Sequence, residues 1–215
     1  MGVRRSIGLA LIVAALTMLT LTWWGTYRGD RAEEEAQRRL AASLTTQVSS
    51  PPPPTDSPSS PSDDPTMPEM SSPVLEVPTY SPGDPVATLR VPRLSLEKVM
   101  VYGTGTAQLA VGPGMFRTAS LPGTLGNLAI AGHRTTHGGP FHDVDDLEPG
   151  DPIYVEYRGR TFEYRVRDTI IVGKKETWVT ADEPGKSTLS LISCYPLHSN
   201  RQRIVVRADL VSPNS

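Results

Sequence analysis

The sequence contains a single cysteine, Cys194, and lacks the residue patterns that mark common metal and nucleic-acid sites. One cysteine cannot form a disulfide within the chain. No Cys-x-x-Cys pair and no His-Glu-x-x-His string is present, so we expect neither a metal nor a cofactor. A net charge of −2 provides no basic excess, which argues against a nucleic-acid partner. No internal repeat is evident.

An uncharged apolar run from Ile7 to Trp24 follows Arg4 and Arg5 near the N-terminus. As a helix it would rise about 27 Å, close to the hydrocarbon thickness of a bilayer. A cleaved signal peptide is the alternative, but its apolar region is usually shorter and ends at a small-residue cleavage site. We therefore predict a cytoplasmic tip and transmembrane anchor at residues 1–27. The preceding arginines place the N-terminus in the cytoplasm and the rest of this single-pass protein outside the cell membrane.

Residues 28–84 have the composition of a spacer. Arg28 to Leu44 is charged and helix-prone but has little apolar face, so a short helix and disorder are both open. Ser49 to Asp84 is dominated by Pro, Ser, Asp and Thr, which favours a disordered, extended linker. Such a linker could reach on the order of 100 Å. It would serve either as a tether that lets a domain work away from the membrane or as a passive connection, and the composition leaves both open.

Residues 85–215 carry nearly all the remaining apolar pattern and are predicted to form one all-β domain. Arg158-Gly159-Arg160 is typical of a hairpin turn, and only Phe141–Leu147 and a turn near Gln108 look helical. Many short strands joined by Gly/Pro turns predict a closed or nearly closed antiparallel barrel. The expected strands are Val86–Val91, Lys98–Tyr102, Asn127–Ala131, Ile153–Tyr157, Thr161–Val172, Thr188–Ser193 and Arg203–Val211.

Three chemically active residues stand at the ends of predicted strands. Cys194 ends one apolar run, Arg203 begins the next, and His133 follows the strand Asn127–Ala131 across Gly132. A thiol needs a nearby base or cation to become a thiolate, and an imidazole can serve as both. A guanidinium offers a fork of donors to a developing oxyanion. Each residue alone would have an ordinary structural explanation, but together they predict a catalytic site of His133, Cys194 and Arg203.

The other histidines and the acidic residues between them have simpler interpretations. His137 and His142 lie in the loop after His133, without a metal-binding spacing. His198 is expected to face solvent or to lie near a substrate. A group of acids resembles the solvated face of a helical turn and lacks the signature of a calcium loop, namely Asp143, Asp145, Asp146 and Glu148.

Three strings give the domain a family resemblance. Ala131–Thr136 reads AGHRTT, Leu189–Pro196 reads LSLISCYP, and Arg203–Ala208 reads RIVVRA. Their order and spacing resemble the active-site strings of the sortases. With Gly112–Gly114 and Pro122-Gly123, the first string is most similar to the class E group of high-GC Gram-positive bacteria.

The resemblance implies an eight-stranded sortase-type β-barrel with short helices. By position, it implies Cys194 as the nucleophile, His133 as the general acid/base and Arg203, rather than Arg201, as the oxyanion or substrate-backbone group. Sortases usually have Thr before the cysteine, and Ser193 here keeps the hydroxyl. Class E members often carry Tyr where this chain has His137, which bears on substrate preference.

The implied reaction is transpeptidation through a thioacyl enzyme. The substrates would be secreted surface proteins with a C-terminal sorting signal, Leu-Ala/Pro-x-Thr-Gly, cleaved between Thr and Gly. The class E likeness favours Ala at the second position. The acceptor would be an amine of a peptidoglycan precursor such as lipid II.

Three alternatives accompany this hypothesis. A pilin-polymerising sortase would use a lysine side chain as the acceptor. An L,D-type transpeptidase would show a His-Gly run just before its cysteine, and Leu191–Ser193 contains none. A non-catalytic, wall-associated barrel scaffold would tolerate loss of the thiol.

Overall fold

The computed structural model describes residues 17–18, 32–46 and 78–214 of the chain. Apart from residues 17–18, the predicted anchor lies outside these residues, as does the larger part of the predicted linker at 28–84, so both stay predictions. Within the described residues, no helix is both long enough and apolar enough to cross a membrane.

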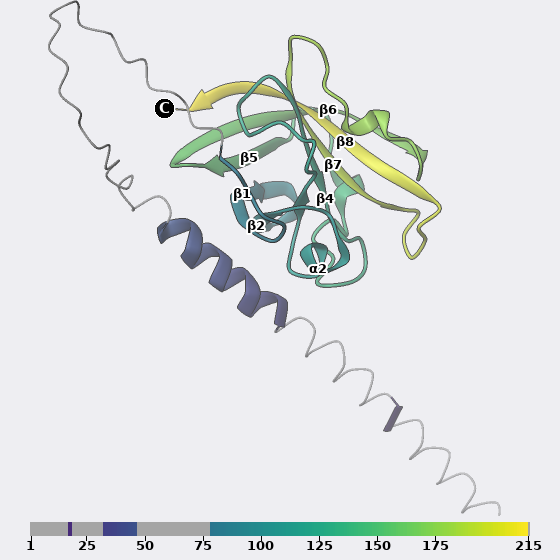
Figure 1. The fold of residues 1–215 in the computed structure, drawn as a ribbon. Helices are drawn as coiled ribbons and strands as arrows, with labels where there is room; N and C mark the ends of the chain where they lie inside the picture. The colour runs from purple at the N-terminus through teal and green to yellow at the C-terminus, as the bar shows by residue number, and fades with distance from the viewer. Residues whose placement is uncertain (1–16, 19–31, 47–77, 215) are drawn as a thin grey trace, which may run out of the picture.

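Eight strands form a closed barrel in the order β1-β2-β3-β4-β7-β8-β6-β5 (Figure 1). All seven predicted strands are present, each within a few residues of its expected ends. The eighth, β3, has only two residues and lies in a segment predicted to be a connection. The strands are β1 (Pro85–Val91), β2 (Leu96–Tyr102), β3 (Gly114–Met115), β4 (Gly126–Ala131), β5 (Pro152–Tyr157), β6 (Arg160–Gly173), β7 (Ser187–Tyr195) and β8 (Gln202–Asn214).

The prediction of a wholly antiparallel barrel is wrong at two pairs. β2 pairs with β3 in parallel, and so does β4 with β7. Parallel neighbours need a crossover, whereas a tight turn can join only antiparallel strands. The short helix α2 (Thr106–Leu109), close to the predicted turn at Gln108, lies in the first crossover. The second crossover contains both β5 and β6.

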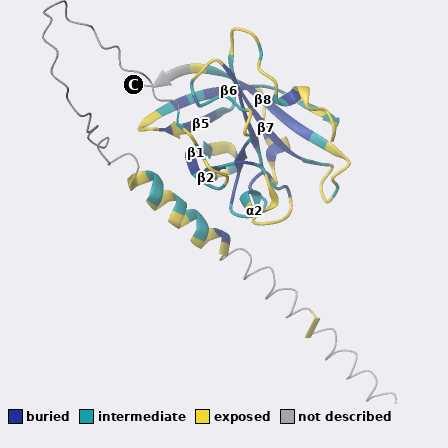
Figure 2. Ribbon diagram, viewed as in Figure 1, coloured by how far each residue is buried: buried dark blue, intermediate teal, exposed yellow. Residues whose placement is uncertain are grey.

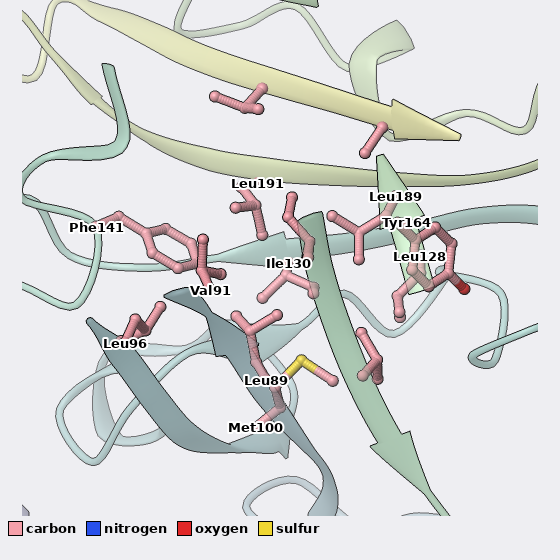
Figure 3. Packing of buried hydrophobic residues seen from close by; sticks show 14 of the residues in the cluster. Leu89, Val91, Leu96, Met100, Leu128, Ile130, Phe141, Tyr164, Leu189 and Leu191 are labelled. Atoms are coloured by element: carbon pink, nitrogen blue, oxygen red, sulfur yellow. The ribbon is translucent and has the colours of Figure 1, made fainter. Parts of the chain in front are cut away.

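The barrel interior is built by the alternation of side chains along each strand. On β7, Leu189 and Leu191 enter the main core, whereas Ile192 belongs to a second cluster on the outer face. Figure 2 shows buried residues along the barrel strands, β7 among them, with the connections largely exposed. Figure 3 shows side chains from opposite sides of the barrel packed together, among them Leu89, Met100, Ile130 and Leu191.

The connections contain only short helical turns. The predicted helix at Phe141–Leu147 is reduced to the 3₁₀ turn η2 (Val144–Asp146), which still buries Val144. The predicted hairpin turn between β5 and β6 is confirmed, because Arg158 and Gly159 have φ of 49° and 75°. Positive φ at both central residues is the geometry of a type I′ turn.

A helix over residues 32–46 packs against the barrel beside β2 (Figure 1), which settles the open choice between helix and disorder for this segment. Glu33 is 4% exposed and pairs with Lys98 at 3.0 Å. The amide of Gln37 accepts from the backbone N–H of Val99 at 2.7 Å and donates to the carbonyls of Val99 and Val111 at 3.2 and 2.5 Å. Partly buried polar contacts therefore help to hold the helix in place.

Replacing Gln37 with Ala should loosen this helix, because three partly buried hydrogen bonds are lost at about 0.5–1.5 kcal/mol each. We expect amide exchange over residues 32–46 to accelerate by about tenfold or more, since about 1.4 kcal/mol corresponds to a factor of ten. Arg38→Ala is the control, because that side chain is 78% exposed. Equal exchange in the two variants would contradict the docking role of Gln37.

Candidate active site

The parallel pairing of β4 with β7 brings two of the predicted site residues to one edge of the barrel. The last paired residues are Ala131 and Ile192. Beyond them, the Gly132 N–H donates to the Ile192 carbonyl at 3.1 Å, and the Ser193 hydroxyl donates to the Gly132 carbonyl at 2.8 Å. The pairing thus continues past the end of β4. The next residue after Gly132 is His133, and the next residue after Ser193 is Cys194.

The third predicted residue lies opposite the thiol on the neighbouring strand. Cys194 and Arg203 are direct partners in the antiparallel ladder of β7 with β8. Directly opposite residues place their side chains on the same face of a sheet. This confirms the expectation that the two strands pair with these residues across one gap.

This face is the outside of the barrel. Strand alternation places Cys194 and Arg203 on the same side as Ile192 and Val205, whose neighbours Leu191 and Ile204 point into the main core. Ile192 and Val205 belong to a buried cluster with Val179, part of the 3₁₀ turn η3 (Trp178–Thr180) in the connection from β6 to β7. The site therefore adjoins an apolar surface that this connection covers.

His133 and Cys194 open into one pocket of about 660 Å³. His198 also lines it and is exposed, as expected for a solvent-facing position. Arg203 is not part of this lining. Its Nη1 donates instead to the carbonyls of Asn200 and Gln202, at 3.2 and 2.8 Å. The lining residues are His133, Arg134, Thr135, Thr136, Cys194, His198, Ser199 and Asn200.

Burial and ring stacking hold the imidazole of His133. Its Nε2 is buried and has no hydrogen-bond partner among the described residues. The ring stacks on His137, with centroids 4.8 Å apart and planes 21° from parallel. Burial, and then the neighbouring charge of His137, lower the pKa of His133 below the ordinary value of a histidine. A neutral imidazole is therefore favoured, and it can take a proton from a thiol or return one to an amine.

The glycine before His133 is needed for close packing. A Cβ at Gly132 would come within 2.5 Å of the Phe141 ring. Phe141 is fully buried, and its N–H donates to the His133 carbonyl at 3.0 Å. The loop after β4 can fold back against its own start only because residue 132 has no side chain.

Sequence reasoning missed one residue at this site, Arg134. It is 4% exposed, and its guanidinium bonds the carbonyls of His142 and Cys194 and the carboxylate of Asp145. The acids predicted to form a solvated face are exposed, and Asp145 pairs with Arg134 from that face. His142 pairs with Asp143 at 2.5 Å. The only signal for Arg134 in the sequence was its place next to His133.

The sequence is similar to those of known proteins. A sortase domain model matches residues 89–211. Sortase SrtE1 of Streptomyces coelicolor is 28% identical over 149 residues, which cover 62% of this chain and 42% of that protein. This chain therefore spans less than half the length of that relative.

Two solved structures share the fold. Sortase E1 from Streptomyces coelicolor, solved with a tripeptide in the active site, has a TM-score of 0.58 at 26% identity and covers 63% of this chain and 93% of its own. Sortase C from Clostridium perfringens, solved with the C-terminal cell wall sorting motif, has a TM-score of 0.58 at 25% identity. The match covers 62% of this chain and 74% of that one.

His137→Gln should raise the pKa of His133, because it removes the charge that repels the second proton while leaving the burial in place. In the unmodified chain, His133 stays neutral down to a lower pH than an exposed histidine does. In His137→Gln, it should become protonated at a higher pH than in the unmodified chain. NMR titration of the labelled imidazoles measures both values. His142→Gln is the control, since that ring pairs with Asp143. An unchanged or lower pKa of His133 in His137→Gln would contradict this account.

Proposed function

The chain belongs to the sortase family, and from this premise we propose that it is a class E-like cysteine transpeptidase that attaches secreted proteins to the cell wall. Its substrates carry a C-terminal Leu-Ala/Pro-x-Thr-Gly signal. The acceptor is the amine of a peptidoglycan precursor such as lipid II. The observation that carries the proposal is the strand pairing. It brings His133 and Cys194 into the lining of one pocket and places Arg203 opposite the thiol.

In the proposed first half-reaction, His133 takes the proton of the Cys194 thiol, and the thiolate attacks the carbonyl carbon of Thr. The tetrahedral intermediate collapses as His133 gives the proton to the glycine amine. The Thr–Gly bond then breaks, and a thioacyl enzyme remains. In the second half-reaction the acceptor amine attacks the thioester and loses a proton to His133, and the Cys194 thiolate leaves. Its reprotonation by His133 restores the starting state.

Arg203 is proposed to stabilise the oxyanion. Its Nη1 is occupied by two loop carbonyls, whereas its Nε and Nη2 groups have no acceptor in the described part of the chain. These two remaining donors are available to an oxygen that gains charge, as is required of a preorganised oxyanion site. The Asn200 and Gln202 carbonyls would fix the guanidinium in place without neutralising it.

The apolar cluster next to the thiol supports a peptide substrate. The outer face of β4, β7 and β8 continues from Cys194 to Ile192, under the cover of Val179 from the η3 connection. Trp178 in the same turn is 52% exposed beside this surface. A peptide with its scissile bond over Cys194 would lie beside this covered apolar surface.

Mass spectrometry of the full chain after incubation with Leu-Ala-x-Thr-Gly and Leu-Pro-x-Thr-Gly peptides tests this function. Cys194 should gain the mass of the peptide up to Thr, and Cys194→Ala should gain none. His133→Ala should slow acylation by about 10²–10⁴-fold, the usual contribution of a positioned proton transfer. Arg203→Lys should slow it by about 10²–10³-fold, because the planar fork is lost.

Arg201→Lys is the matched control for Arg203→Lys, because Arg201 is exposed and its hydrogen-bond partner in the described residues is Ser199. Peptide joining to an amine by Cys194→Ala would refute the assignment of the nucleophile. Joining to lysine side chains alone, with no product from a peptidoglycan amine, would contradict attachment to the wall.

The membrane location is part of the proposal and is supported by the apolar run at Ile7–Trp24 behind Arg4 and Arg5. Protease added to intact protoplasts that express the full chain should digest the folded domain. A cytosolic protein of the same cells is the control and should survive. Protection of the domain until the cells are lysed would place it on the wrong side for wall attachment.

A further inference from the structure

The position of His133 is not set by its own ring contacts. The imidazole makes no hydrogen bond to any described residue, so no carboxylate orients it from behind. Stacking on His137, which is itself exposed and has φ of 51°, is a soft constraint. The distance between His133 and the thiol must therefore be fixed mainly through the backbone on either side of the histidine.

On the amino-terminal side, that fixing is provided by β7. The Gly132 carbonyl accepts from the Ser193 hydroxyl at 2.8 Å, which joins the residue before the histidine to the residue before the cysteine. The resulting contact is short and buried. It leaves the other side of His133 to be held separately.

On the carboxyl-terminal side, the fixing group is a guanidinium. Arg134 donates from Nη1 to the Cys194 carbonyl at 3.4 Å, from Nε to the His142 carbonyl at 2.5 Å and from Nη2 to the Asp145 carboxylate at 2.5 Å. These acceptors lie at the nucleophile and at the far end of the loop that begins with His133. A single planar group thus connects two backbone carbonyls and one carboxylate around the site.

We propose that Arg134, held by Asp145, is a positioning residue of the transpeptidation reaction, setting the His133 imidazole at its working distance from the Cys194 thiol. This inference rests on the proposed function. The buried cation is neutralised by Asp145, whose side chain is 48% exposed, and its two other bonds go to backbone carbonyls. Lysine would keep the charge at this position but could not reproduce the fork.

Kinetics of the full chain with the sorting peptide test this role. Arg134→Lys should lower kcat by about 10–100-fold, since a misplacement of about 1 Å can cost a factor of that order, and should change KM much less. Asp145→Asn should show a smaller loss in kcat of the same kind. Asp146→Asn is the matched control, because that neighbouring acid is exposed and its side chain has no partner among the described residues. Rates are normalised to the folded fraction, measured by circular dichroism.

A double-mutant cycle separates positioning from general structural support. The readout is the alkylation rate of Cys194 by iodoacetamide, which needs no peptide turnover. With His133 present, Arg134→Lys should slow alkylation at neutral pH. With His133 already replaced by Ala, Arg134→Lys should change the alkylation rate by less than about twofold. An equal effect in both backgrounds would show that Arg134 acts on the barrel rather than through His133, and would overturn the proposal.

Three further outcomes bear on the role of Arg134 or on the proposed function. If folded Arg134→Lys keeps kcat within about twofold of the unmodified chain, Arg134 has no positioning role. If Arg134→Lys does not fold, Asp145→Asn decides, and activity equal to that of Asp146→Asn overturns the proposal. Failure of the unmodified chain to acylate with either peptide would instead refute the proposed function, and the alkylation cycle would still report on Arg134.

Discussion

The parallel pairing of β4 with β7 is the constraint on which the site depends. Parallel neighbours end at the same edge of a sheet, so His133 and Cys194 leave their strands together. β8 runs antiparallel to β7 and therefore brings its first residues, including Arg203, to that same edge. If β4 ran the other way, its last residue would lie at the opposite end of the barrel from the thiol. The long crossover that contains β5 and β6 is the structural requirement for this arrangement.

Arg167 and Arg203, near the two ends of β7, have different kinds of partners. At the end of β7 remote from the thiol, Arg167 pairs with Glu183 and Asp209 at 2.5 and 2.8 Å. The hydrogen bonds of Glu183 to Arg167 and Lys186 lower its pKa to about 2. At the thiol end, no carboxylate of a described residue pairs with Arg203, whose bonds go to carbonyl groups. The absence of a paired carboxylate in the described part of the chain is what the proposed oxyanion role of Arg203 requires.

Alternation and turn chemistry sufficed to predict seven of the strands, because each has a buried face. They could not indicate β3, since two residues carry no period, or the direction of pairing, since parallel and antiparallel strands show the same alternation. The candidate site followed from residues at strand ends, which need only the strand boundaries. Arg134 was missed because a buried arginine has no periodic signature. Asp145 is exposed, as its place among solvated acids predicts, but that pattern does not reveal that the 3₁₀ turn η2 leaves its carboxylate within reach of Arg134.

The docked helix changes the meaning of the proline-rich segment. Composition leaves open that this segment is a tether between membrane and domain. Residues 32–46 precede it, yet they are bonded to the barrel through Gln37 and Glu33, and the chain after it begins β1 of the same barrel. While the helix stays docked, both ends of the segment are attached to one body, so its length adds nothing to the reach of the domain. Glu33 also approaches the loop of His133, since a Cβ on Gly138 would lie within 2.3 Å of its carboxylate. The helix over residues 32–46 is thus held against both β2 and the loop that follows His133.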